Sequence, residues 1–180
     1  MGCAPHCQQA MSIDEVATII GRIADGFEDA CRECLWDNSG KVYLCITEQL
    51  ICGVDGNGDY LEPNYDNDPF FDEPGRWHGE QEKYKAWKRT IHPTNPGLLD
   101  LPPRPDNIPN LYIDGTFHSE IEPQPIEDGL HIDPGNRKGP AIVEKYGDKI
   151  LLLSPTAVEY FNKKFMRDAI ANFFKNCGYG

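Results

Sequence analysis

Apolar residues recur every three or four positions in a long stretch near the start of the chain. The stretch opens with Ser12-Ile-Asp-Glu15, a capping-box pattern in which Ser12 caps free backbone amides and Glu15 reaches back. This spacing predicts a helix from Ile13 to about Trp36. Its apolar stripe consists of Ile13, Val16, Ile20, Ile23, Phe27, Ala30, Cys34 and Leu35.

A second stretch of helical spacing lies at the other end, from Thr156 to Lys175. Its apolar positions are Val158, Phe161, Phe165, Ala169, Ile170, Phe173 and Phe174. Lysine and arginine occupy the other faces, so the pattern predicts an amphipathic C-terminal helix. Both ends of the chain are therefore expected to be helical.

Shorter elements are predicted between these helices. Asp114-Gly115 favours a tight turn into a helical turn that places Phe117 and Ile121 on one face. Two strands follow, Ile121 to Ile126 and Gly129 to Ile132, joined at Glu127-Asp128. A short helix carrying Ile142, Val143 and Tyr146 should end at Gly147, and Ile150 to Leu153 forms a compact apolar segment.

The segment after the first helix is ambiguous. Asp37-Asn-Ser-Gly40 is expected to break the helix. Lys41 to Cys52 then fits a helix by spacing or a strand by composition, and we favour the helix. Glu80 to Ile91 also has helical spacing.

Residues 54–109 read as an irregular, proline-rich insertion. Asp-Gly and Asn-Gly pairs near its start predict a tight turn. Its last part, the arm from His92 to Pro109, holds six prolines and is expected to be extended. Because the arm still carries Leu98, Leu99, Leu101 and Ile108, we expect it to pack on a neighbouring subunit.

These elements predict the α+β fold class, with a long N-terminal helix and a C-terminal helix packed on a small antiparallel sheet. We divide the chain into an N-terminal segment, residues 1–11, and a single domain, residues 12–180, that contains the insertion. A chain of 180 residues of which 39% are hydrophobic can bury one such core.

Charge and composition narrow the function. The formal net charge of −12 argues against a nucleic-acid partner, because binding phosphates requires clustered lysine and arginine. The chain shows neither a long apolar run nor a secretory signal, so we expect neither a membrane location nor export. Seven cysteines without an export signal favour reduced thiols.

Two groups of residues have the spacing of metal ligands. Cys3, His6 and Cys7 together with Cys31 and Cys34 could supply a zinc site, although Cys34 falls on the apolar stripe of the first helix. Asp55-x-Asn57-x-Asp59 resembles the opening of a calcium loop, with Asp66 at the twelfth position, but the glycine required at the sixth position is Tyr60. A plain turn and buried thiols are the favoured interpretations, so we assign no metal or cofactor.

No catalytic motif is recognisable. The histidines at positions 78, 92, 118 and 131 offer bases, yet none lies in a nucleophile elbow or a catalytic phrase. A phosphate-binding loop and a dinucleotide fingerprint are also lacking in the sequence. We therefore expect no enzyme activity, and His118 is expected to be structural.

Three phrases resemble the small head-to-tail connector and tail-completion proteins of tailed phages. Gly115-Thr-Phe-His-Ser-Glu-Ile121 resembles the family phrase Thr-Gly-x-Leu-x-x-Ser-Ile, with Gly and Thr exchanged. Ile142-Val-Glu-Lys-Tyr-Gly147 resembles its aromatic-Val-Glu-x-Gly segment. Pro155 with Phe165-Met-Arg-Asp-Ala-Ile170 resembles its proline-containing loop and closing helix. The likeness covers the first helix and about the last third of the chain.

The resemblance implies a structural virion protein, a ring subunit of the neck or upper tail that joins the portal and head-completion proteins to the tail and lines the DNA channel. It would be made in the host bacterial cytoplasm and would bind DNA without sequence specificity, if at all. The alternative is a small metal-binding adaptor or regulatory protein that uses the cysteine and histidine cluster. A small hydrolase of unrecognised type ranks third.

Overall fold

The computed structural model describes residues 11–179. Helix α1 spans Ile13–Asp37 and begins with the predicted capping box, in which Ser12 Oγ accepts from the Glu15 amide at 3.2 Å and Glu15 Oε2 accepts from the Ser12 amide at 2.8 Å. Helix α2, Ser39–Ile51, follows after the single residue Asn38. The helix favoured for residues 41–52 is thus confirmed, and the strand alternative is wrong.

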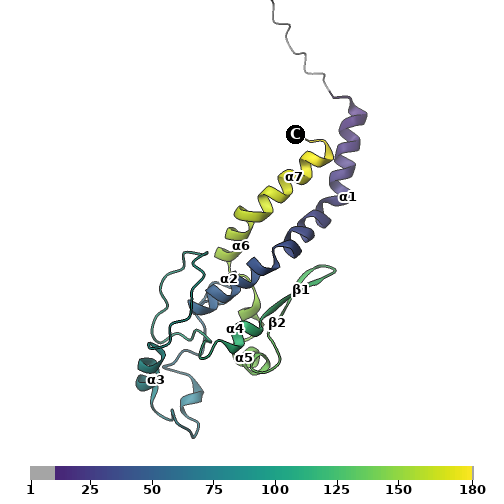
Figure 1. The fold of residues 1–180 in the computed structure, drawn as a ribbon. Coiled ribbons are helices and arrows are strands. Elements are labelled where there is room, and N and C mark those ends of the chain that lie inside the picture. Colours follow the sequence, from purple (N-terminus) through teal and green to yellow (C-terminus); the bar gives the residue numbers. More distant parts are fainter. Residues whose placement is uncertain (1–10, 180) are drawn as a thin grey trace, which may run out of the picture.

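The predicted break between these helices is only one residue long. Asn38 Nδ2 donates to the Cys34 carbonyl oxygen at 2.9 Å, so its side chain satisfies a carbonyl at the end of α1. Residues 45–51 of α2 are all buried, so tertiary packing of this half holds the helix in place although Ser39 and Gly40 at its start have weak helix propensity. The two helices therefore run on almost continuously (Figure 1).

The C-terminal helix is confirmed with one irregularity. Helix α6 spans Pro155–Phe161, a π-helical turn spans Asn162–Met166, and helix α7 spans Arg167–Cys177. Ser154 Oγ caps the start by accepting from the Ala157 amide at 3.3 Å. Gly178 ends the helix at φ 99°, a left-handed conformation that favours glycine.

A two-stranded antiparallel sheet lies beside α1 and α2. Strand β1, Glu122–Ile126, pairs with β2, Gly129–Asp133, so that Glu122 faces Asp133 and Ile126 faces Gly129. Helix α4, Thr116–Glu120, leads into the sheet, and helix α5, Gly139–Tyr146, leaves it and ends at Gly147 as predicted. The apolar segment from Ile150 begins in a 3₁₀ helix, η2, Asp148–Leu151.

One central core holds these elements together, which confirms the predicted α+β fold. The predicted pair Phe117 and Ile121 is buried there, together with the predicted face of α5 at Tyr146. Its other buried members are Cys34, Val42, Ile46, Leu50, Leu61, Ile108, Ile150 and Phe161. Val42, Ile46 and Leu50 come from α2, which contributes more of them than any other element.

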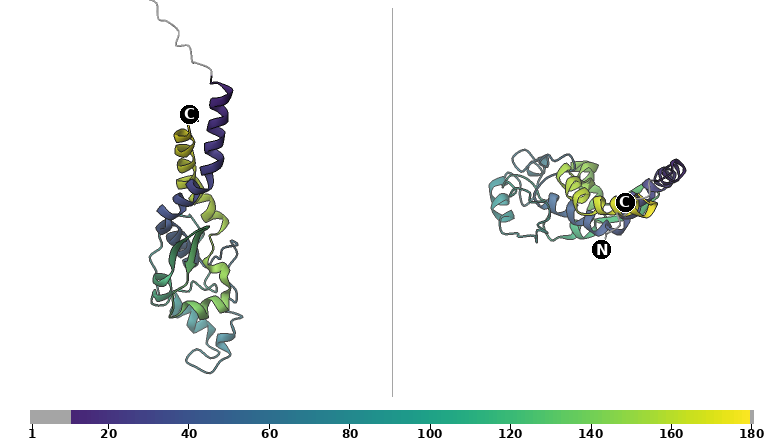
Figure 2. Two further views of the ribbon diagram at one scale, coloured as in Figure 1. Left: turned by 90° about the vertical axis from the view of Figure 1, so that its right-hand side faces the viewer. Right: turned by 90° about the horizontal axis from the view of Figure 1, so that it is seen from above.

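The molecule is elongated. The first half of α1 and helix α7 run side by side as a two-helix projection, and the sheet, the insertion and the shorter helices form a body at its base (Figures 1 and 2). Among residues 11–179, no helix is both long enough and apolar enough to cross a membrane.

The insertion is more ordered than its composition predicts. It contains a 3₁₀ helix, η1, Pro69–Phe71, and helix α3, Gln81–Lys88, within the helical stretch expected from the sequence. Tyr65, Phe71 and Tyr84 are buried against one another, and Trp77 and Trp87 pack around them. The insertion thus builds a second, aromatic core inside its own chain.

The prediction that the arm needs a neighbouring subunit is wrong. Leu99 is buried against Cys45 of α2 and Ala157 of α6, and Ile108 belongs to the central core. The buried Glu48 carboxylate of α2 accepts from the amides of Leu98 at 2.6 Å and Leu99 at 3.0 Å. Because proline leaves few backbone donors in the arm, one carboxylate suffices to hold this stretch on its own domain.

Candidate functional site

Two of the five candidate zinc ligands, Cys31 and Cys34, lie among the described residues. Cys31 and Cys34 lie in α1, where burial raises the pKa of both thiols, and Cys34 packs in the central core as the apolar stripe predicted. Cys3, His6 and Cys7 lie outside the described residues. Within residues 11–179, no three His, Cys, Asp or Glu side chains are placed to hold a metal ion.

The calcium-like loop uses its first carboxylate internally. Asp55 Oδ1 accepts from the amides of Asn57 at 2.8 Å and Asp59 at 3.2 Å, and Asp55 Oδ2 lies 2.8 Å from Lys149 Nζ. Val54 pairs with Tyr60 across the loop. These contacts form the tight turn that the sequence predicted.

The four candidate bases are not brought together. His78 and His92 lie on either side of α3, and His131 lies on β2, all three exposed. His118 of α4 is buried beside Tyr112 and Phe117. His118 Nε2 lies 3.1 Å from the Asn110 carbonyl oxygen, to which it is hydrogen-bonded. Among the described residues, no nucleophile lies within hydrogen-bonding distance of His118.

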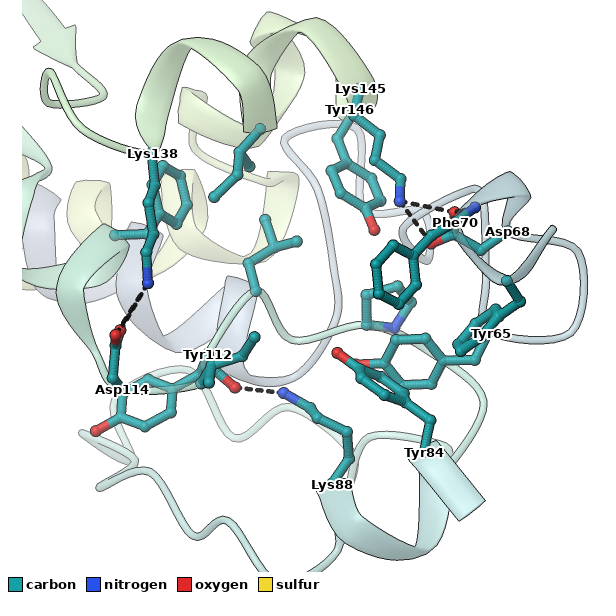
Figure 3. Close-up of a pocket in the computed structure, with 16 residues that line it drawn as sticks. Tyr65, Asp68, Phe70, Tyr84, Lys88, Tyr112, Asp114, Lys138, Lys145 and Tyr146 are labelled. Carbon is teal, nitrogen blue, oxygen red and sulfur yellow. Dashed lines mark hydrogen bonds and ion pairs between the residues drawn. The ribbon is translucent and has the colours of Figure 1, made fainter. Parts of the chain in front are cut away.

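The most enclosed candidate site is a pocket of about 240 Å³, here called the aromatic pocket (Figure 3). Three separate parts of the chain form it: the insertion with α3, the segment 109–117, and α5. Apolar and aromatic side chains make most of its wall. They are Tyr65, Phe70, Phe71, Tyr84, Pro109, Leu111, Tyr112, Ile113, Phe117, Ile142 and Tyr146.

Two ion pairs flank the aromatic pocket (Figure 3). Lys145 of α5 lies 2.6 Å from Asp68, whose other oxygen also accepts from the Phe70 amide at 2.9 Å. Lys138 lies 2.9 Å from Asp114. The Thr116 amide and Lys138 hold the pKa of the Asp114 carboxyl well below its usual range. Asp114 therefore stays ionised and paired with Lys138 at neutral pH.

Lys88, the last residue of α3, reaches the aromatic pocket from the other side. Its side chain is 2% exposed, and Nζ donates to Asn110 Oδ1 at 2.7 Å and to the Tyr112 carbonyl oxygen. Burial, and next the charge of Arg104, lower the pKa of Lys88 to about 8. Lys88 thus carries a proton at neutral pH, held by neutral acceptors.

Tyr65, Tyr84 and Tyr146 of the wall stay protonated as well. Burial raises the pKa of Tyr84 to about 12, and burial also raises the pKa of Tyr65 and Tyr146. In Figure 3 the hydroxyl group of Tyr146 points toward the Phe70 ring and the interior of the pocket. The pocket therefore combines apolar walls with hydrogen-bond donors, an arrangement suited to binding.

Sequence reasoning did not find this pocket. Helical spacing placed Tyr84 and Trp87 on one side of α3, and Lys88 is four residues after Tyr84, so the pattern could have placed Lys88 on the same buried face. The other walls come from residues 13 or more positions away from Tyr84. Their meeting depends on the tertiary fold.

A second candidate site is a surface. The stripe predicted along α1 is buried at Cys34 but not at its start, where Ile13 is 87% exposed, Ile20 61% and Val16 42%. Helix α7 covers the adjacent side, where Arg22 Nη1 contacts the Cys177 carbonyl oxygen at 3.5 Å and Phe173 packs on Phe27. We define the α1 apolar face as Ile13, Val16, Ala17, Ile20 and Ala24.

Comparison with protein-family models, curated proteins and solved structures gave no match.

Proposed function

We propose that this protein is a structural subunit of a ring in the neck or upper tail of a tailed phage, where it joins the portal and head-completion proteins to the tail. The α1 apolar face is the observation that carries the proposal. Monomeric proteins rarely leave a continuous row of large aliphatic side chains uncovered. The role is mechanical, and no catalytic step is needed.

The spacing along α1 favours another helix as the covering element. Apolar residues alternate at intervals of three and four from Ile13 through Val16 and Ile20. The stripe continues through Ile23, Phe27, Ala30 and Cys34, where α7 packs on Phe27 and the central core buries Cys34. This is the heptad pattern of helices that pack lengthwise on one another. Every copy of the chain carries such a helix, so a ring of identical subunits supplies the partner.

The edge of the α1 apolar face suits close packing. Ala17 and Ala24 flank the larger side chains, and no charged residue belongs to the face. Burying an isoleucine or valine contributes about 1.5–3 kcal/mol, so several of them at each contact suffice for association. The acidic charge of −12 lies elsewhere and would repel DNA within a channel instead of gripping it.

The order of elements agrees with the resemblance. A long helix comes first, α4 carries the Gly115 to Ile121 phrase, the short sheet follows, α5 carries Val143-Glu-Lys-Tyr-Gly147, and α6 with α7 closes the chain. This order supports a connector. The assignment to a virion rests on the resemblance.

The test is the oligomeric state of the purified protein. Wild type should give ring particles in negative-stain images and a multiple of the 20.3 kDa chain mass by light scattering. The double variant Ile13→Gln, Ile20→Gln should be monomeric with unchanged helix content by circular dichroism. The matched control Asp14→Gln, Asp25→Gln, which changes other positions on α1, should still form rings. A monomeric wild type would refute the proposal.

Detection of the protein in purified virions by mass spectrometry would test the phage assignment separately. If the protein forms rings but is absent from virions, the proposal that it assembles into a ring would stand and the proposal that it belongs to a phage particle would fail.

The alternative function is a metal-binding adaptor. Cys31 and Cys34, the two of its candidate ligands that the structure describes, give it no support. Cys34 packs in the central core, and its thiol keeps a raised pKa because of burial. Zinc binds the thiolate, so this environment opposes coordination. Elemental analysis showing one zinc per chain would reverse this ranking.

A further inference from the structure

The aromatic pocket holds a cation whose charge is not compensated within the pocket. Lys138 and Lys145 each contact an aspartate, whereas Lys88 Nζ has only the amide oxygen of Asn110 and the carbonyl oxygen of Tyr112. Across residues 11–179, no carboxylate oxygen lies within 4 Å of Lys88 Nζ. Burying an ammonium group without a counter-charge is costly, so an external anion would be stabilising here.

The surroundings of Lys88 favour an anion although the whole chain is acidic. Three lysines line the pocket against two aspartates, and Arg104 lies close enough to oppose the charge of Lys88. Arg104 in turn donates to the carbonyl oxygens of Pro105 and Ile108, which are neutral. The local excess of positive charge is thus confined to the side of the pocket formed by α3 and residues 104–112.

The size and rim of the pocket indicate what accompanies the anion. A volume of about 240 Å³ is below the 300–1,000 Å³ of ordinary cofactor and drug sites but accepts a large side chain. Phe70 and Ile113 line the pocket and remain 43% and 52% exposed, so apolar surface continues outside it. A small free molecule would leave that rim uncovered, whereas a polypeptide could cover it.

We propose that the aromatic pocket binds a protein segment that presents an aromatic or large aliphatic side chain next to a carboxylate. The apolar side chain fills the space between Tyr84, Tyr146 and Phe117. The neighbouring carboxylate accepts from Lys88 Nζ in a charge-assisted hydrogen bond, which is stronger than a neutral one. The segment's backbone lies across the rim at Phe70 and Ile113. The inference does not depend on the proposed ring, since the pocket lies within one chain.

Two dipeptides test the charge requirement. Acetyl-Phe-Glu-amide and acetyl-Phe-Gln-amide differ only in the carboxylate, and saturation-transfer NMR on the peptide protons gives their affinities for the full-length protein in any assembly state. At pH 7 the glutamate peptide should bind about tenfold more tightly, because a charged hydrogen bond is lost in the other. This preference should shrink as the pH rises from 7 to 9.5 and Lys88 loses its proton.

Variants locate the site. Lys88→Met keeps the length of the side chain and should bind both peptides equally, while Lys83→Met, a change of an exposed lysine on the same helix, should keep the tenfold preference. If Lys88→Met fails to fold, Phe70→Ala at the exposed rim tests instead whether the peptides bind in the aromatic pocket. It should weaken both peptides several-fold while keeping the preference for glutamate.

Three outcomes would overturn the proposal. Equal affinity of the two peptides for wild type would remove the role of Lys88. Binding unaffected by both Lys88→Met and Phe70→Ala would place the peptides elsewhere. Tighter binding of 3-phenylpropionate than of the glutamate peptide would show that the pocket takes a small organic acid instead of a protein segment.

Discussion

His118 is a buried histidine whose environment makes folding sensitive to mild acid. Its Nε2 lies 3.1 Å from the Asn110 carbonyl oxygen and therefore carries the proton of the neutral ring. Burial lowers the pKa of His118 to about 4, from an ordinary value of 6.5. Between these two values the unfolded chain binds more protons than the folded one, so His118 reduces stability as the pH falls.

Replacing His118 by Gln should remove this sensitivity, because an amide can donate to the same carbonyl oxygen and does not titrate. We expect the urea midpoint of wild type to fall more between pH 7 and pH 4.5 than that of His118→Gln. Carboxylates contribute equally to both proteins and cancel in the difference. Parallel pH profiles would show that His118 takes up its proton without unfolding.

Lys88 should give a dependence of the same sign, stability rising with pH, but in alkaline solution. Its pKa is lowered to about 8 in the folded protein from 10.5, chiefly by burial, so the unfolded chain holds more protons between these values. Wild type should therefore gain stability relative to Lys88→Met as the pH rises from 8 to 10. Urea unfolding at both pH values measures the difference. A constant difference would mean that Lys88 stays protonated when buried.

At the scale of elements, the spacing of apolar residues predicted which helices and strands form, but not always which other element covers their apolar faces. The helices at 13–36 and 156–175, the two strands and the stop at Gly147 are all present, because local patterns and turn residues determine them. The stripe of α1 was correctly placed on one face. Whether Ile13 and Ile20 are covered depends on α7, which packs on the adjacent side and leaves them exposed.

For the arm, the sequence predicted that apolar side chains are covered but named the wrong partner. The leucines of the arm indicated burial, and in the structure Leu99 is buried while Leu98 and Leu101 are partly buried. The sequence could not show that Glu48, some 50 residues earlier, provides an acceptor for the amides of Leu98 and Leu99. The aromatic pocket was missed for the same reason, since Tyr65, Lys88 and Tyr146 are distant in the sequence. Contacts of this kind are set by the whole fold.

The attachment of the arm can be tested through Glu48. Glu48→Gln offers one carbonyl oxygen in place of two carboxylate oxygens and leaves one buried amide unpaired, which costs about 1–3 kcal/mol. The free energy of unfolding should drop by this amount, and the amides of Leu98 and Leu99 should exchange faster with deuterium. Glu73→Gln, a change of an exposed carboxylate in the insertion that contains the arm, is the control and should leave both quantities nearly unchanged. Unaltered protection at Leu98 would show that side-chain packing alone holds the arm.

At the scale of the whole molecule, packing is uneven from one end to the other. The body buries residues 45–51 of α2 on all sides, while among the described residues the first half of α1 has only α7 beside it (Figure 2). A helix supported on one side opens locally at lower free energy than one enclosed in a core. Association with other subunits can therefore raise the local stability of the two-helix projection more than that of any other part of the chain.

Hydrogen exchange should detect this difference. In the monomeric variant Ile13→Gln, Ile20→Gln, amides of residues 16–27 should exchange much faster than those of α2, because little apolar contact opposes opening of the helix. In assembled wild type the same amides should be protected, since a neighbouring helix on the α1 apolar face must leave before they open. Protection of α2 should be the same in both proteins, which excludes a general loss of stability. If residues 16–27 exchange equally fast in assembled wild type, the subunits meet through another surface and the α1 apolar face does not join them.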